Sequence, residues 1–267
     1  MKKLFLMLAA LPFFAACDSV GPDDRYIEVE NVSAERKVLL EEFTGQRCVN
    51  CPTAHAIIER LEEQYGDDLI VVSIHAGSDQ NAISVPFGLK QTVGDIYANH
   101  WGIDAYPAGV VDRSGGKLGY DAWATAIRED LAKPTPLRID VSAMISNSGN
   151  TPVIEIATEL NSSANINGSL QLWVVENGIV ALQTDKDLGR IPDYVHNNVF
   201  RACVNGEWGQ SITLEANSPQ EISNSISVHE NSTYEVDNWN LDNLYIVAFY
   251  YNDSGVVQVE RCKVLNP

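Results

Sequence analysis

Two cysteines separated by two residues, Cys48 and Cys51, are the side chains of this sequence best suited to chemistry. An apolar run precedes them and an amphipathic run follows, so the pair is expected where a strand turns into a helix. The positive field of a helix N-terminus stabilises a thiolate there, and the second thiol, one turn away, can close a disulfide. The spacing therefore predicts a dithiol/disulfide redox site.

Two other roles for the pair stay open from the residues alone. It could be a permanent structural disulfide, or it could bind copper or zinc with histidines such as His55, His75 or His100. The sequence holds no second Cys-x-x-Cys, and Pro52 stands where attachment of a c-type haem requires a histidine. We therefore expect no metal and no cofactor.

The elements around the cysteines predict a parallel βαβ unit. Residues 37–44 form an apolar run, residues 53–65 carry apolar side chains at helical spacing, and residues 69–74 are apolar and rich in β-branched side chains. A βαβ unit places its site at the sheet edge where strand turns into helix, which is where the cysteines fall. Downstream we expect two further helices and a strand, within residues 89–101, 120–131 and 108–111.

A domain boundary is predicted at Lys133-Pro134-Thr135-Pro136, because the pattern of apolar residues changes there. From Leu137 onward apolar and polar residues alternate, in runs separated by Asn, Gly, Ser and Asp. Eight or so such runs without a convincing helix predict a β-sandwich.

The N-terminus has the features of an export signal. Two lysines precede an apolar run over residues 4–16 that is too short to span a bilayer. Phe14-Ala15-Ala16-Cys17 resembles a bacterial lipobox, with Phe14 in place of the usual leucine, and predicts lipidation of Cys17 rather than an ordinary cleaved signal. Four cysteines then remain, an even count that suits an oxidising compartment and allows a structural disulfide between Cys203 and Cys262.

Several of these features together resemble the thioredoxin fold. They are a strand with Glu42-Phe43, the Cys48-x-x-Cys51 helix, a second strand, and Tyr106-Pro107 before a third strand. The resemblance implies that Cys48 is the nucleophile, Cys51 the resolving thiol, Pro107 a cis-proline beside the disulfide, and Glu42 a buried acid that moves protons. The alternative for Glu42 is a solvent-exposed side chain without a role in proton transfer, beside an inward-facing Glu41. Arg47 departs from the aromatic residue usual before the first cysteine, and should favour the thiolate.

The whole chain is similar to the 28-kilodalton outer membrane protein family of Bacteroidetes lipoproteins. The similarity rests on the lipobox-like leader, Glu-Glu-Phe-Thr-Gly before the cysteines, Tyr-Pro-Ala-Gly-Val-Val after them, and residues 194–201. The expected organisation is then a lipoprotein signal over residues 1–17, a tether over 18–36, an α/β thioredoxin-like domain over 37–133, and an all-β sandwich, immunoglobulin-like or jelly-roll, over 137–267.

The predicted function is thiol–disulfide exchange by an outer membrane lipoprotein of the bacterial envelope. Its partners would be protein thiols and disulfides, and the membrane through the lipid on Cys17. A formal net charge of −18 makes nucleic acid a poor partner. The alternative is a surface binding or adhesion protein whose disulfide is structural or vestigial.

Overall fold

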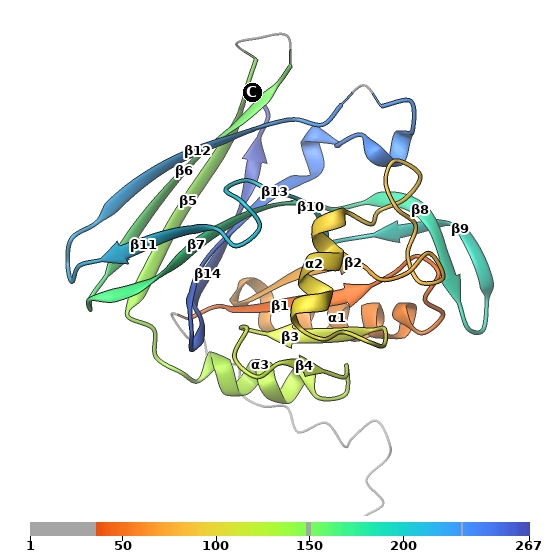
Figure 1. Ribbon diagram of the computed structural model, residues 1–267, viewed down its shortest axis with the longest axis horizontal. Helices are drawn as coiled ribbons and strands as arrows, with labels where there is room; N and C mark the ends of the chain where they lie inside the picture. The colour runs from red at the N-terminus through yellow and green to blue at the C-terminus, as the bar shows by residue number, and fades with distance from the viewer. Residues whose placement is uncertain (1–35, 148–150, 231) are drawn as a thin grey trace, which may run out of the picture. The chain divides into compact units, whose positions relative to one another are not determined.

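The computed structural model describes residues 36–147, 151–230 and 232–267, and these belong to one compact unit. Within them, a twelve-stranded mixed sheet organises the chain (Figure 1). Its strands, in order across the sheet, are β12 (Gln220–Ser227), β6 (Val153–Ser162), β5 (Leu137–Ser146), β14 (Gly255–Leu265), β13 (Leu244–Asn252), β7 (Ile166–Glu176), β10 (Val199–Cys203), β2 (Leu69–His75), β1 (Val38–Thr44), β3 (Ala108–Val111) and β4 (Lys117–Leu118), with β11 (Gln210–Leu214) also paired to β7.

The remaining elements lie outside this sheet. Strands β8 (Ile179–Asp185) and β9 (Gly189–His196) form a separate hairpin. The helices are α1 (Cys51–Tyr65), α2 (Thr92–His100) and α3 (Trp123–Leu131), with short 3-10 turns η2 (Gly66–Asp68), η3 (Glu235–Asp237) and η4 (Leu241–Asn243). Among the described residues, no helix is both long enough and apolar enough to cross a membrane.

The predicted βαβ unit is present as β1, α1 and β2. The two strands pair in parallel, from Val38 opposite Leu69 to Thr44 opposite His75. Alternate residues of β1 serve opposite faces of the sheet: Val38 and Leu40 pack in the cluster that α1 and α3 cover, whereas Phe43 packs in the cluster that contains α2 residues. Both faces of β1 are buried, which explains why its apolar run is continuous.

The central strands β7 and β13 join the two halves of the chain into one sheet. Leu172 of β7 and Ile246 of β13 pack in the large apolar core formed with β5 and β6. Their neighbours Trp173 and Val247 face the other way, into the core that β1 and β2 share. Because both faces are covered, the side chains of β7 from Leu170 onward are all buried.

The expected fold class, an α/β thioredoxin-like domain followed by a separate all-β sandwich, is wrong. The described residues are mostly β, with 46% in strands and 18% in helices, and they contain only three α-helices on one large mixed sheet. The physical reason is a non-local pairing: β10 pairs in parallel with β2 and antiparallel with β7, so the sheet continues past the predicted boundary. The division into parts over residues 37–133 and 137–267 stays a prediction.

A buried ion pair fixes β1 to the turn after β3. Arg113 donates from Nη2 to Glu41 Oε1 at 2.8 Å and from Nε to Oε2 at 3.1 Å, and both side chains are almost fully buried. The guanidinium also lies over aromatic rings, 4.7 Å from the ring centre of Phe249 and 4.6 Å from that of Tyr251. Glu41 therefore has a structural partner on the sheet face opposite to Glu42.

Candidate functional site

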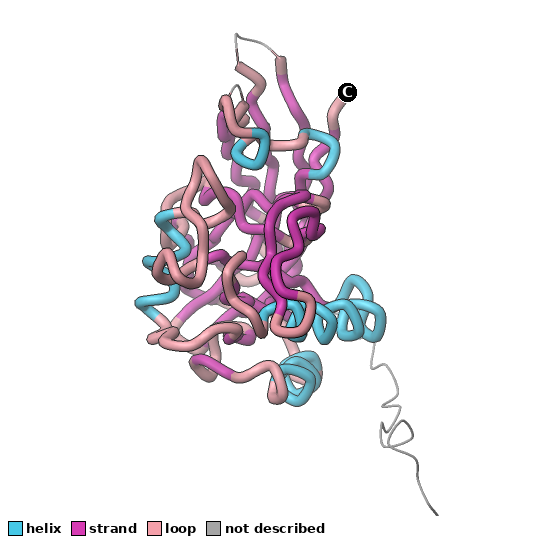
Figure 2. The backbone as a smooth tube through the Cα atoms, turned by 90° about the vertical axis from the view of Figure 1, so that its right-hand side faces the viewer, coloured by secondary structure: helices cyan, strands magenta, loops and turns pink. Residues whose placement is uncertain are grey.

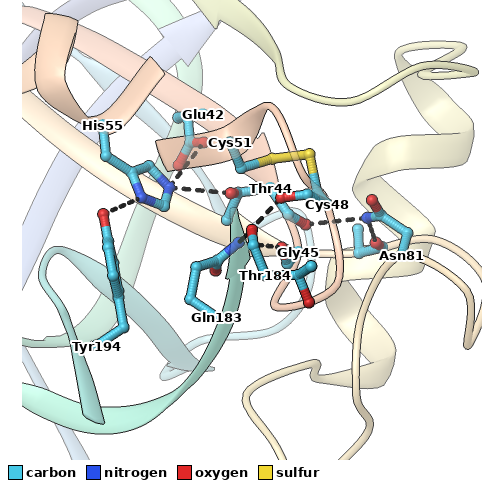
Figure 3. Close-up of a disulfide and its surroundings, with 11 residues drawn as sticks. Glu42, Thr44, Gly45, Cys48, Cys51, His55, Asn81, Gln183, Thr184 and Tyr194 are labelled. Carbon is cyan, nitrogen blue, oxygen red and sulfur yellow. Dashed lines mark hydrogen bonds and ion pairs between the residues drawn. A yellow bond between two sulfur atoms is a disulfide. The ribbon is translucent and has the colours of Figure 1, made fainter. Parts of the chain in front are cut away.

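Cys48 and Cys51 form a disulfide at the carboxyl end of β1, where the chain turns into α1 (Figure 3). Their Cα atoms lie 5.5 Å apart. Cys51 is the first residue of α1 and is fully buried, whereas Cys48, in the turn before the helix, keeps 7% of its surface exposed. Pro52 fits the first helical turn because its missing N–H would have no partner within the helix. Of the two cysteines, only Cys48 has any exposed surface.

Glu42 lies beneath the first turn of α1, on the β1 face that also carries Val38 and Leu40. Its side chain is fully buried, and neither carboxylate oxygen has a hydrogen-bond partner in the described part of the chain. The alternative, in which Glu42 is exposed beside an inward Glu41, is wrong because β1 is covered on both faces and both side chains are buried. A buried carboxyl group that accepts no hydrogen bond is costly, which makes Glu42 unusual among the buried acids of the described residues.

His55 is the side chain that reaches Glu42. It lies one helical turn after Cys51 on the same face of α1, and its Nε2 is 3.5 Å from Glu42 Oε1. The same nitrogen hydrogen-bonds with Thr44 Oγ1 at 3.0 Å. The other ring nitrogen, Nδ1, hydrogen-bonds with the hydroxyl of Tyr194 at 2.8 Å (Figure 3).

The hairpin β8–β9 is bonded to the cysteine loop. Gln183 is fully buried and donates from Nε2 to the carbonyl oxygens of Gly45 at 3.3 Å and Cys48 at 3.0 Å. The main chain adds bonds from Thr184 N to Gln46 O and from Lys186 N to Val49 O. In Figure 2 the hairpin faces the viewer. The hairpin therefore fixes the backbone on which Cys48 lies.

Pro107 lies at the same edge of the sheet. Ala108 pairs with Phe43 in the antiparallel β1–β3 ladder, so Pro107 is one residue past this pair, near the strand end that leads to the cysteines. The Tyr106–Pro107 peptide bond is cis, as expected. Its role beside the disulfide stays a prediction. Arg47 is exposed and donates from Nη1 to the carbonyl oxygen of Asp79.

The expected disulfide between Cys203 and Cys262 is absent from the described residues, where both thiols are free. Cys203 is on β10 and Cys262 on β14, with β7 and β13 between them. Three strand spacings amount to about 14 Å, whereas a disulfide needs Cα atoms within about 7 Å. Burial raises the pKa of each thiol to about 11, so both stay protonated near neutral pH and are poor nucleophiles.

Two buried histidines, His75 and His196, lie close to each other. His75 ends β2 and His196 ends β9, and their ring centres are 5.3 Å apart. Burial, the largest cause, lowers the pKa of both, in the case of His196 to about 4. Among the described residues, no three His, Cys, Asp or Glu side chains are grouped so that they could hold a metal ion, and His100 is exposed on α2. Cys17, the predicted lipidation site, lies outside the described residues.

Sequence reasoning missed the contribution of the hairpin to this site. His55 entered only as a metal candidate, and Gln183 not at all, although both contact the cysteine turn or the buried acid. Gln183 is 135 residues from Cys48, and no local periodicity reports such a contact. The segment over residues 194–201 supplied a weak signal, since Tyr194 and His196 both belong to it.

Comparison with known proteins shows the family of this chain. The model of the outer membrane protein Omp28 family matches residues 94–266, well over half of the chain. The class is thus that of outer membrane proteins, and the chain belongs to the Omp28 family. This assignment also places it at the outer membrane. Curated protein sequences give no match.

Solved structures resemble the chain only distantly. A structural-genomics protein of Agrobacterium tumefaciens is 14% identical with a TM-score of 0.47, over 85% of this chain and 93% of that one. The sporulation control protein Spo0M of Bacillus subtilis is 8% identical with a TM-score of 0.31, over half of each chain.

Proposed function

We propose that this outer membrane protein exchanges thiols and disulfides with other proteins through Cys48 and Cys51. The observation that carries the proposal is the asymmetry of the pair: Cys48 has exposed surface and Cys51 has none. The buried carboxyl group of Glu42 lies 3.5 Å from His55, which is one helical turn after Cys51 on α1. A permanent structural disulfide needs neither this asymmetry nor a buried acid without hydrogen bonds. The pair itself is the redox group, so the reaction needs no cofactor.

The exchange runs through a mixed disulfide. A partner thiolate attacks Sγ of Cys48, the Cys48–Cys51 bond breaks, and Cys51 leaves as a thiolate that takes a proton. A second partner thiolate then attacks the mixed disulfide, which leaves a disulfide in the partner and a thiol at Cys48. In the opposite direction the Cys48 thiolate attacks a partner disulfide, and Cys51 resolves the intermediate after giving up its proton. Glu42 is the group we assign to this proton transfer.

Substitution of the resolving cysteine tests the proposal. With Cys51→Ser the mixed disulfide cannot be resolved, so partner proteins should accumulate on Cys48 and be released by reductant. The matched control is Cys48→Ser, which keeps the buried thiol and should trap nothing. Absence of any trapped protein with Cys51→Ser in envelope extracts would contradict exchange with proteins.

A second candidate is a surface-binding protein in which the disulfide only holds the turn before α1. The observation in its favour is that just 7% of Cys48 is exposed beneath the hairpin contacts. In that case reduction should unfold the turn and lower stability without yielding mixed disulfides.

We further propose that the chain is held at the membrane by lipid on Cys17. The support is the lipobox-like sequence that ends at this residue. Cys17→Ser should abolish incorporation of labelled fatty acid and release the protein from the membrane fraction. Labelled protein in the Cys17→Ser variant would contradict this anchor.

A further inference from the structure

The sheet face beneath α1 changes from apolar to polar toward the cysteines. At the amino ends of β1 and β2 it carries Val38, Leu40, Leu69 and Val71, which pack against α1. At the carboxyl ends the same face carries Glu42, Thr44, Ser73 and His75, all of them buried. Burying polar groups costs stability unless they are paired, so a concentration of them next to one disulfide needs an explanation.

These groups connect to a contact path that leads away from Cys51. The path begins at Glu42, continues through His55 Nε2 at 3.5 Å, and crosses the ring to Nδ1, which is 2.8 Å from the hydroxyl of Tyr194. Figure 3 shows His55 between the carboxyl group of Glu42 and the hydroxyl of Tyr194. An imidazole has two ring nitrogens, so it can release a proton at one while taking up a proton at the other.

The far end of the path meets solvent. Tyr194 is partly exposed, and with His75 and His196 it lines a polar pocket of about 40 Å³. A pocket of this size and polarity can hold water, which can exchange protons with the phenol. Burial raises the pKa of Tyr194 to about 12, so its hydroxyl stays neutral and can both donate and accept.

We propose that His55 and Tyr194 relay protons between Glu42 and solvent during exchange at Cys51. This inference rests on the proposed function and extends it by naming the route. When Cys51 leaves as a thiolate, it takes the proton of the Glu42 carboxyl group, and Glu42 regains one from His55 Nε2. His55 Nδ1 then takes the proton of the Tyr194 hydroxyl, which is replaced from water, and the reverse step restores the first tautomer of His55.

Other titratable groups surround the path and belong in any account of its pH dependence. From the elements packed around it, these are Glu59 and Glu62 on α1, His75 on β2, Asp185 on β8 and His196 on β9.

The test is the rate at which a small dithiol, dithiothreitol, reduces Cys48–Cys51 in the full chain, followed against pH. Tyr194→Phe keeps the ring and removes the hydroxyl, and we expect it to slow reduction on the order of tenfold and to flatten the pH profile. The reduction potential should stay unchanged, because a relay alters rates and leaves the equilibrium alone. A structural role for Tyr194 would instead shift the potential or the stability.

Tyr234→Phe, which removes an exposed hydroxyl elsewhere, is the matched control. His55→Gln breaks the path at its middle, and its reduction rate is the test if Tyr194→Phe does not fold. Wild-type rates and pH profiles in both path variants would overturn the relay while leaving the trapping of partner proteins untouched. A wild-type disulfide that dithiothreitol cannot reduce in the folded chain would overturn both the relay and the proposed function.

Discussion

The pH dependence of stability should reveal the buried histidine at the end of the hairpin. His196 is 3% exposed, and its Nε2 has no hydrogen-bond partner among the described residues. Burial first, and then the neighbouring His55, lower the pKa of His196 to about 4. In the unfolded chain the same imidazole titrates near its ordinary value of about 6.5.

The direction of this pH dependence follows from which state, folded or unfolded, binds the proton. Between these two values the unfolded chain binds a proton that the folded chain does not, so lowering the pH favours unfolding. The contribution of the neutral His196 to stability is therefore fully present above about pH 6.5 and is lost as the pH falls toward 4. From pH 7 to pH 5 the loss from His196 alone is about 2 kcal/mol, at about 1.4 kcal/mol for each pKa unit.

Urea unfolding of the oxidised protein at these two pH values measures this loss. Other groups contribute as well: the pKa of His75 is also lowered, while burial raises that of Asp112 to about 6, which acts in the opposite direction. The informative quantity is thus the difference between wild type and His196→Gln, which keeps a polar side chain without a titrating ring. We expect the variant to lose about 2 kcal/mol less on acidification.

Equal pH dependence in wild type and His196→Gln would refute this reasoning, since it would mean that the imidazole accepts a proton in the folded protein as easily as in the unfolded chain. His100→Gln is the control, because it replaces an imidazole that is already exposed on α2.

Three further predictions follow from the described contacts. Glu41→Gln leaves the Arg113 guanidinium buried without its counter-charge and should cost about 3–5 kcal/mol in urea unfolding; a loss under 1 kcal/mol would contradict the burial of the pair. Gln183→Ala removes the amide that holds the cysteine turn, and should cost about 1–3 kcal/mol and speed reduction of the disulfide by dithiothreitol; an unchanged reduction rate would mean that the hairpin does not restrain the turn. Titration of free thiols in the unfolded, unreduced chain that begins after residue 17 should find two, those of Cys203 and Cys262. Finding no free thiol would contradict this and would indicate a disulfide between these two cysteines.

Local periodicity was enough to predict the elements that hold the cysteines. The strand at Val38–Thr44, the helix that ends at Tyr65 and the parallel strand at Leu69–His75 all follow from spacing of apolar residues, and the structure confirms them. The helix begins at Cys51, two residues earlier than its apolar pattern, because the first turn of a helix tolerates both the cysteine and Pro52.

Non-local pairing could not be predicted in this way. The alternation of apolar and polar residues predicts a strand within residues 195–204. It does not predict that the strand found there, β10, inserts between β2 and β7 and continues the sheet. The same limit applies to the cysteines: an even count suggested a bond between Cys203 and Cys262, whereas their strands are separated by two others. The contacts of Gln183 and Tyr194 with the site depend on the position of the hairpin, which no local pattern encodes.

The most direct test of the central claim is the equilibrium of the Cys48–Cys51 disulfide in glutathione buffers, followed by counting alkylated thiols by mass spectrometry. If the pair exchanges with proteins, it should pass from oxidised to reduced at a potential between about −120 and −270 mV, the range of known exchange proteins. A pair that stays oxidised below about −300 mV would be a structural disulfide and would contradict the proposed function.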